Sequence, residues 1–224
     1  MQSQDITFPS NGDTARGFLA NPEKGIPLPG VVIIQEWWGL DAHIRDIVRH
    51  FAEMDFVALA PDLYHGVVVK EPDDARKEAM ALDRGRAMKE IDGAVAYLKS
   101  LPEVLPKKIG VVGFCMGGGI ALHVAARNAD VGAVVAYYGG GAPGAEAFAG
   151  SNAAILNIVG ERDRVLPTIQ ALDAALQSYP HPHEVIVYAN ADHAFFNDTR
   201  PEVYDAEAAR DAWALVTGFF NDKL

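Results

Sequence analysis

One short segment restricts the possible folds of this chain more than any other. Residues 113–119 read Gly-Phe-Cys-Met-Gly-Gly-Gly, between an apolar run that begins at Ile109 and a second one that begins at Ile120. The pattern predicts a strand, a sharp turn at Cys115 and a helix, which is the G-x-C-x-G form of a nucleophile elbow. Such a turn holds its central residue in a strained backbone conformation and leaves room only for small neighbours, here Gly113 and Gly117.

Cys115 is the only cysteine in the chain, which excludes an internal disulfide and a cysteine-based metal cluster. The positive end of the helix after the turn points at the sulfur, and this favours a reactive thiolate. The alternative is a buried free cysteine beside a glycine-rich helix contact. A phosphate-binding loop is excluded, because no lysine follows the glycines and no G-x-G-x-x-G motif matches in register.

The rest of the chain alternates apolar runs with helical periodicity. Residues 6–8 and 15–19 are expected to be two strands of a hairpin that turns at Asn11-Gly12. Further strands are expected at residues 31–34, 56–60, 109–112, 133–138, 154–159 and 184–188. Helices are expected from Asp41, around 88–98, after Cys115, after Pro167 and over about 205–220, with a surface loop at 65–75. This order predicts an α/β fold with a mostly parallel sheet and helices on both faces, as one domain over residues 1–224.

Charge and hydropathy exclude several classes of partner and location for this protein. The net charge of −11 argues against nucleic acid and anionic membranes as partners. No stretch approaches the ~18 uninterrupted apolar residues of a membrane span, and the N-terminus lacks the pattern of a secretory signal. We therefore expect a cytoplasmic protein that acts on a small molecule.

Two strand ends supply partners for Cys115. Asp163 follows the strand at 154–159, and His193 follows the strand at 184–188. The order nucleophile, acid, histidine is that of the α/β-hydrolase fold. In that arrangement His193 would take the thiol proton and later activate water, and Asp163 would orient the imidazole. Asp192 is a rival acid, but it adjoins His193 in sequence and should point elsewhere.

The remaining histidines suggest no metal site. His181 and His183 have the spacing of a metal pair, but Pro182 between them indicates a loop and no third ligand is evident. The other four histidines fit helix or loop surfaces. We therefore predict no metal.

The strand at 31–34 ends in Gln-Glu-Trp-Trp-Gly at 35–39. In this fold the corresponding loop gives one oxyanion-hole amide, which we assign to Trp37, and Met116 after the nucleophile gives the other. Glu36 lies between an apolar strand and two tryptophans, so we expect it to be poorly solvated and a candidate partner of the thiol. The side chains of Trp37 and Trp38 either line the pocket or pack against the sheet edge.

These motifs together resemble the dienelactone hydrolase (carboxymethylenebutenolidase) family over nearly the whole chain. The resemblance rests on residues 35–39, on Ala-Pro-Asp-Leu-Tyr at 60–64, and on 113–118, 160–163 and Asp-His-Ala-Phe at 192–195. It implies an α/β-hydrolase fold, no cofactor, a monomer and a Cys115-Asp163-His193 triad. It also implies that Glu36 contacts the resting thiol and helps to generate the thiolate. The implied reaction is attack of that thiolate on a lactone enol ester, followed by hydrolysis of the thioester.

The sequence departs from the family at one position. The family has an arginine four residues after the catalytic histidine that holds the substrate carboxylate, and Asn197 stands there. A second family arginine corresponds to Arg76, Arg84 or Arg86, and the sequence does not align one of them. The pocket residues we expect are Trp38, Tyr64, Tyr138, Phe195 and Asn197.

The leading hypothesis is a cysteine hydrolase of lactones or small esters. A broader carboxylesterase or thioesterase with the same triad is an alternative. A ligand-binding or redox-sensing protein without catalysis is a further one, but every catalytic position is filled.

Overall fold

The computed structural model describes all residues from 1 to 224. The chain divides into two compact units, Met1–Val111 and Val112–Leu224, and the boundary falls within strand β5 (Ile109–Phe114). Because the units are not placed relative to one another, the expectation of a single domain stays a prediction.

The first unit has four strands, in the order β1-β2-β4-β3. Their bounds are β1 (Gln2–Ser10), β2 (Asp13–Asn21), β3 (Gly30–Ile34) and β4 (Val57–Pro61). The hairpin of β1 and β2 is antiparallel, β2 and β4 are antiparallel, and β3 and β4 are parallel. Asn11 and Gly12 both have positive φ angles, of 53° and 77°, as a two-residue hairpin turn requires. The hairpin prediction is confirmed.

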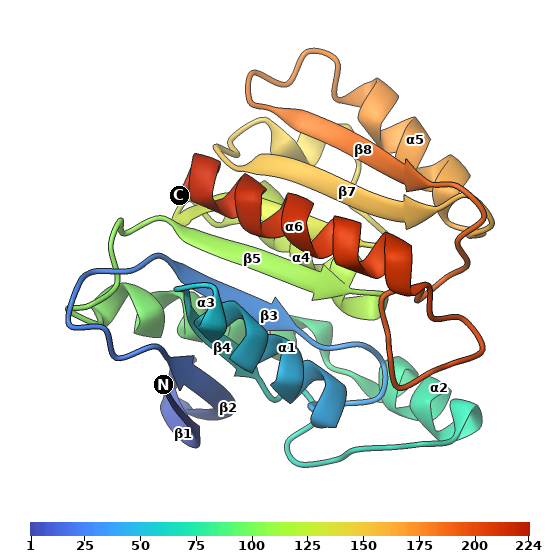
Figure 1. Cartoon of the computed structure of the whole chain (residues 1–224). Coiled ribbons are helices and arrows are strands. Elements are labelled where there is room, and N and C mark those ends of the chain that lie inside the picture. The colour runs from blue at the N-terminus through green and yellow to red at the C-terminus, as the bar shows by residue number, and fades with distance from the viewer. The chain divides into compact units, whose positions relative to one another are not determined.

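The sheet of the first unit is covered on both faces. Helix α1 (Ala42–Glu53) lies in front of β3 and β4 in Figure 1, and α3 (Arg84–Ser100) lies behind them. The α1 helix buries Ile44, Ile47 and Phe51, and Asp41 caps it by accepting a hydrogen bond of 3.0 Å from the Ile44 N–H. Burial on both faces explains why β3 and β4 are continuous apolar runs.

One helix was missed by the sequence prediction. Helix α2 (Pro72–Ala81) begins inside the segment 65–75 that was expected to be loop. Pro72 at its start and two aspartates in its first turn are typical of a helix N-terminus. Only Ala75 is buried, so the helix has no apolar periodicity that would have revealed it.

The second unit continues the alternation, with β5 leading into the strands β6, β7 and β8 in that order. The bounds are α4 (Met116–Arg127), β6 (Val131–Tyr137), the 3₁₀ helix η1 (Ala145–Phe148), β7 (Ala154–Gly160), α5 (Leu166–Ala175), β8 (His183–Tyr188) and α6 (Ala206–Lys223). The pairs β6–β7 and β7–β8 are parallel. In Figure 1, α6 lies in front of these strands and α4 and α5 lie behind them.

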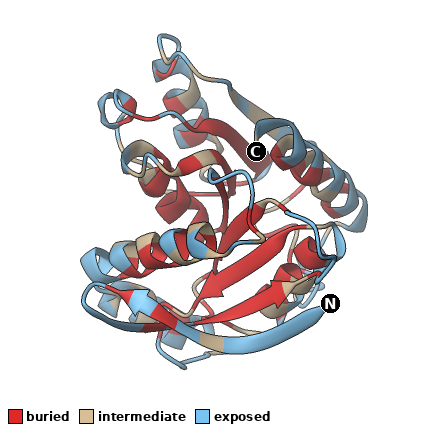
Figure 2. Ribbon diagram, turned by 90° about the vertical axis from the view of Figure 1, so that its left-hand side faces the viewer, coloured by how far each residue is buried: buried red, intermediate tan, exposed pale blue.

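Burial separates the inner strands from the outer ones. Every residue of β7 is buried, whereas β8, at the end of the strand order, is partly exposed. The same contrast is visible in Figure 2, where the inner strands are red and the strand at the N-terminus is largely pale blue. The carboxyl ends of β7 and β8 point to the same side of the unit (Figure 1), which brings the loops after them together. None of the helices has the length and apolar character that crossing a membrane would need.

Candidate active site

The turn at Cys115 has the geometry that the sequence predicts. Cys115 lies between β5 and α4 with φ 53° and ψ −112°, a conformation that costs on the order of 1–3 kcal/mol for a residue with a side chain. Its backbone N–H donates to the Tyr137 carbonyl over 3.0 Å, and its own carbonyl accepts from Gly118 over 3.1 Å. These bonds hold the strained turn at the end of β5.

Glycines make the turn possible. A Cβ on Gly113 would overlap the backbone of Gly117, which confirms the crowding expected two residues either side of the cysteine. A second close approach was not predicted. A Cβ on Gly118 would lie 2.7 Å from the Tyr137 oxygen and 2.8 Å from Gly139 Cα. The start of α4 is therefore packed directly against the backbone that follows β6.

The structure brings the three predicted side chains into one hydrogen-bonded chain. His193 Nε2 lies 3.1 Å from the Cys115 Sγ, and His193 Nδ1 lies 2.7 Å from the Asp163 Oδ2. The Asp163 side chain is fully buried, and its Oδ1 accepts a hydrogen bond of 3.0 Å from the Val165 N–H. The carboxylate that contacts His193 is thus Asp163, and the hydrogen bond goes to this residue rather than to Asp192.

The environment of His193 favours its protonated form. Burial acts to lower its pKa, but the hydrogen bonds to Asp163 and Cys115, together with their charges, raise the pKa from 6.5 to about 10. A protonated imidazole donates through both ring nitrogens, toward the Asp163 carboxylate on one side and the sulfur on the other. This arrangement places a proton donor beside the sulfur at neutral pH.

Aromatic rings surround His193. The Tyr138 ring centroid lies 5.0 Å from the imidazole and 5.9 Å from the Phe195 ring, and both aromatic side chains are fully buried. Tyr138 has a φ of 41°, a rare backbone conformation that the sequence did not reveal. Tyr138 therefore packs against His193 and limits the orientations of its ring.

The Asn197 side chain is buried and forms hydrogen bonds within its own loop. Its Oδ1 accepts hydrogen bonds from the N–H of Thr199, over 3.1 Å, and from the Thr199 hydroxyl, over 2.6 Å. This turn shapes the segment that follows His193. Substrate binding by Asn197, Tyr138 and Phe195 stays a prediction.

In the first unit, Glu36 is only 2% exposed, as expected from its apolar neighbours. The rings of Trp37 and Trp38 meet edge to face with centroids 5.1 Å apart. The segment is anchored on both sides, because the Leu63 N–H donates to the Gln35 Oε1 over 3.2 Å and the Val69 N–H donates to the Trp38 carbonyl over 3.0 Å.

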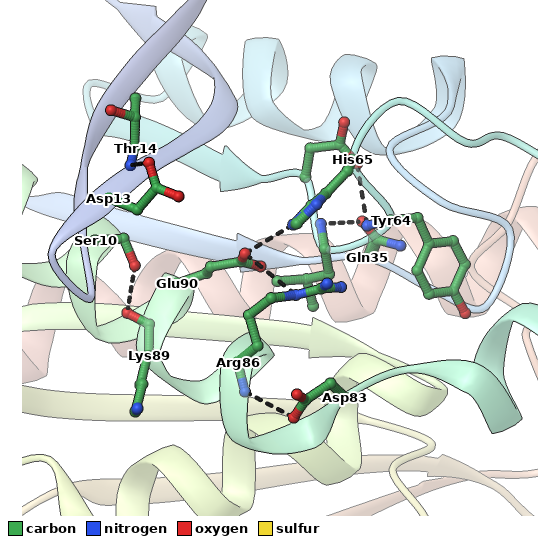
Figure 3. Close-up of polar contacts among 12 residues, drawn as sticks. Ser10, Asp13, Thr14, Gln35, Tyr64, His65, Asp83, Arg86, Lys89 and Glu90 are labelled. Carbon is green, nitrogen blue, oxygen red and sulfur yellow. Dashed lines mark hydrogen bonds and ion pairs between the residues drawn. The ribbon is translucent and has the colours of Figure 1, made fainter.

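Figure 3 shows the polar contacts beside Tyr64. His65 Nε2 lies 2.7 Å from the Glu90 Oε1, and the Arg86 Nε lies 3.5 Å from the same oxygen. Arg76 pairs with Asp73 of its own helix over 3.1 Å. Two of the three candidate arginines are therefore paired with carboxylates, whereas no such pair is formed by Arg84.

The side chains of His181 and His183 each contact a neighbouring side chain. His183 Nδ1 lies 2.8 Å from the Asp173 Oδ1, and the His181 ring packs on Tyr179 with centroids 5.4 Å apart. Nowhere do three or more His, Cys, Asp or Glu side chains converge as metal ligands would.

The sequence interpretation missed the residues that join the loops after β7 and β8. Glu161, Arg162 and Asn190 form side-chain hydrogen bonds between these loops. The one signal in the sequence is the motif Gly-Glu-Arg-Asp at 160–163, which predicts a role for its aspartate alone.

Comparison with known proteins places the chain in a family. The sequence profile of the Dienelactone hydrolase family matches residues 15–224. "Protein usf" of Aquifex pyrophilus is 36% identical, with 99% of each chain covered. A dienelactone hydrolase-like promiscuous phosphotriesterase from metagenomic libraries superposes with a TM-score of 0.88 at 25% identity, covering 99% of this chain and 98% of that one. Dienelactone hydrolase from Anabaena variabilis has the same fold, with a TM-score of 0.74 at 21% identity and coverage of 100% and 98%. The α/β-hydrolase fold expected from the sequence is confirmed, and the chain belongs to the dienelactone hydrolase family of hydrolases.

Proposed function

We propose that this chain is a cysteine-dependent hydrolase of lactones, enol esters or other small esters, and that it works through a thioester acyl-enzyme. The observation that supports this most directly is the contact chain from Cys115 through His193 to the buried Asp163 carboxylate. A sulfur on a strained turn, with a protonated imidazole beside it, has the arrangement that nucleophilic catalysis by cysteine requires.

Acylation begins when the Cys115 thiolate attacks the ester carbonyl carbon and forms a tetrahedral intermediate. As the carbonyl reforms, the C–O bond to the leaving group breaks, and His193 gives its Nε2 proton to the departing oxygen. The product of this step is a thioester on Cys115 and a free alcohol or enol; in a lactone the two remain parts of one molecule.

Deacylation uses the same groups in reverse. Neutral His193 takes a proton from water, and the resulting hydroxide attacks the thioester carbonyl. The C–S bond breaks, the carboxylic acid product leaves, and the sulfur returns as a thiolate beside the imidazolium. Asp163 holds the ring in the required tautomer and stabilises its positive charge in both half-reactions.

The oxyanion of each tetrahedral intermediate needs hydrogen-bond donors. We assign these to the backbone N–H of Met116, at the start of α4, and of Trp37. We assign to Glu36 the role that the family gives to the glutamate of this motif, which is to assist formation of the thiolate. The burial of Glu36 supports a role other than that of a surface charge.

The substrate is a small ester, with Trp38, Tyr64, Tyr138, Phe195 and Asn197 as the proposed pocket residues. The pairing of Arg86 with Glu90 and of Arg76 with Asp73 supports neutral esters over substrates that need a free arginine. Of the three candidates, Arg84 would be the residue to bind a carboxylate. A broad carboxylesterase or thioesterase is the alternative within the same chemistry, and a monomer in the cytoplasm stays a prediction.

The deciding experiment measures p-nitrophenyl acetate hydrolysis before and after treatment with iodoacetamide. Because Cys115 is the only thiol, alkylation needs no assignment among several cysteines. The proposal predicts turnover that disappears as one alkyl group is incorporated. Turnover that survives complete alkylation would exclude Cys115 as the nucleophile. Reversible peroxide modification without any turnover would favour the redox-sensing alternative.

A further inference from the structure

The loops that carry Asp163 and His193 approach each other at backbone distance. One begins at Gly160, the last residue of β7, and runs to residue 163, and the other follows β8 and spans 189–193. A Cβ on Gly160 would overlap the Ala191 carbonyl oxygen, so only glycine fits at this position. The spacing of the two loops is therefore fixed at their point of closest contact.

Two backbone hydrogen bonds join the loop after β7 to the end of β8 and the loop that follows it. The Glu161 N–H donates to the Tyr188 carbonyl over 2.9 Å, and the Arg162 N–H donates to the Ala191 carbonyl over 3.0 Å. Both donors lie beyond Gly160, which forms the last registered pair of the two strands with Tyr188. The pairing of β7 and β8 is thus extended from the strands into the loops.

Two hydrogen bonds that involve side chains also join these two loops. The Asn190 N–H donates to the Glu161 Oε2 over 2.9 Å, and the Arg162 guanidinium donates to the Asn190 Oδ1 over 3.1 Å. Asn190 has a φ of 60°, and both its backbone N–H and its side chain are engaged by the opposite loop. We call Glu161, Arg162 and Asn190 the loop clasp.

Stability alone does not account for the loop clasp. All three side chains are exposed, and hydrogen bonds between exposed groups add little to the free energy of unfolding. The clasp does determine where the two loops lie relative to each other. Asp163 is two residues beyond Glu161, and His193 is three residues beyond Asn190, so displacement of either loop changes the hydrogen bond between the acid and the imidazole.

We propose that Glu161 is a positioning residue for the Asp163–His193 pair and that it acts through the Asn190 N–H. This inference rests on the proposed function, because it assigns a role within the same triad. Glu161 touches neither the sulfur nor the imidazole. Its contribution is to hold the His193 loop at the distance from Asp163 that a short hydrogen bond requires.

The test compares Glu161→Ala, which removes the acceptor, with Glu161→Gln, which keeps an acceptor oxygen but no charge. Glu184→Ala is the matched control, because Glu184 is an exposed glutamate on β8 and its removal changes the net charge equally. Two measurements are made on each variant. One is kcat and KM for p-nitrophenyl acetate, and the other is an NMR titration of the His193 ring.

We expect Glu161→Ala to lower kcat roughly tenfold with little change in KM, as for a misplaced catalytic group. We expect the pKa of His193 to fall toward 6.5, because the Asp163 hydrogen bond is among the contacts that raise it. Glu161→Gln should restore both values, and Glu184→Ala should leave both at the wild-type level.

Two results would overturn the inference. Equal losses in Glu161→Gln and Glu161→Ala would show that charge, and not the hydrogen bond, is responsible. A wild-type kcat and titration in Glu161→Ala would show that the clasp positions nothing. The titration does not depend on turnover, so a protein that hydrolyses no ester would refute the proposed function while the His193 shift still decides the role of Glu161.

Discussion

Two glycines in helices should respond in opposite directions to the same substitution. Gly118 lies in the first turn of α4, where a Cβ would meet the Tyr137 oxygen at 2.7 Å and Gly139 Cα at 2.8 Å. Gly218 lies in α6, where a Cβ would have no atom within 4 Å. The neighbours of Gly118 are backbone atoms, which cannot rotate away as the end of a side chain can.

The expected magnitudes follow from these surroundings. In a helix, alanine is favoured over glycine by about 1 kcal/mol, so Gly218→Ala should raise the free energy of unfolding by up to that amount. Gly118→Ala has the same helix preference, but overpacking against backbone costs about 1–3 kcal/mol and should exceed it. In a protein of this size, 1 kcal/mol corresponds to a change in Tm of roughly 2–4 °C.

The assay is thermal and urea unfolding of both variants, followed by kcat for p-nitrophenyl acetate. Gly118→Ala should unfold at a lower temperature and a lower urea concentration than the wild type. It should also lose activity, because moving α4 away from Gly139 displaces Cys115. Gly218→Ala should unfold at the same temperature as the wild type or later, with unchanged kcat. The reasoning is refuted if Gly118→Ala matches Gly218→Ala in both stability and turnover.

Four further predictions concern the proposed catalytic groups. Cys115→Ser should lower kcat/KM by roughly a hundredfold or more, because a hydroxyl needs more basic assistance than a thiol; comparable rates would argue against a thiolate nucleophile. Asp163→Asn should lower kcat by at least about tenfold and reduce the pKa of His193, which NMR titration would detect. Because folding raises the pKa of His193, protonation of this residue adds to the free energy of unfolding. The added stability is fully present below pH 6.5 and is lost as the pH rises toward about 10. The difference in unfolding free energy between the wild type and His193→Gln should therefore shrink across that interval, as measured by urea unfolding at several pH values. A difference that stays constant with pH would contradict the prediction. Glu36→Gln should slow acylation severalfold while the circular dichroism spectrum stays unchanged, and wild-type acylation would remove its proposed role.

The contact chain of Cys115, His193 and Asp163 was predictable because each of these residues carries a local signal. Cys115 lies in a glycine pattern that only a strand-turn-helix connection explains, and Asp163 and His193 follow apolar strands. The carboxyl ends of parallel strands meet on one side of a sheet, so the three positions could be brought together without coordinates. Asp163 is favoured over Asp192 on a different ground, because Asp192 adjoins His193 in the sequence and should point elsewhere, and the hydrogen bond of 2.7 Å between Asp163 and His193 agrees with this.

Features that depend on loop conformation were not predictable. Glu161 and Asn190 are exposed polar residues, and nothing in their spacing shows that one accepts a hydrogen bond from the backbone of the other. Tyr138 reads as the last residue of a strand, yet it has a positive φ and packs on His193. Helix α2 was missed because it buries almost nothing.

The central claim is that an acyl group is carried by the sulfur of Cys115. Its most direct test is acid quenching during p-nitrophenyl acetate turnover, followed by mass spectrometry of the intact protein and of its peptides. We predict one acetyl group per chain, located on the peptide that contains Cys115, removable by neutral hydroxylamine and absent from Cys115→Ala. Turnover with no acetylated protein at any quench time, or an acetyl group on a different residue, would contradict the claim.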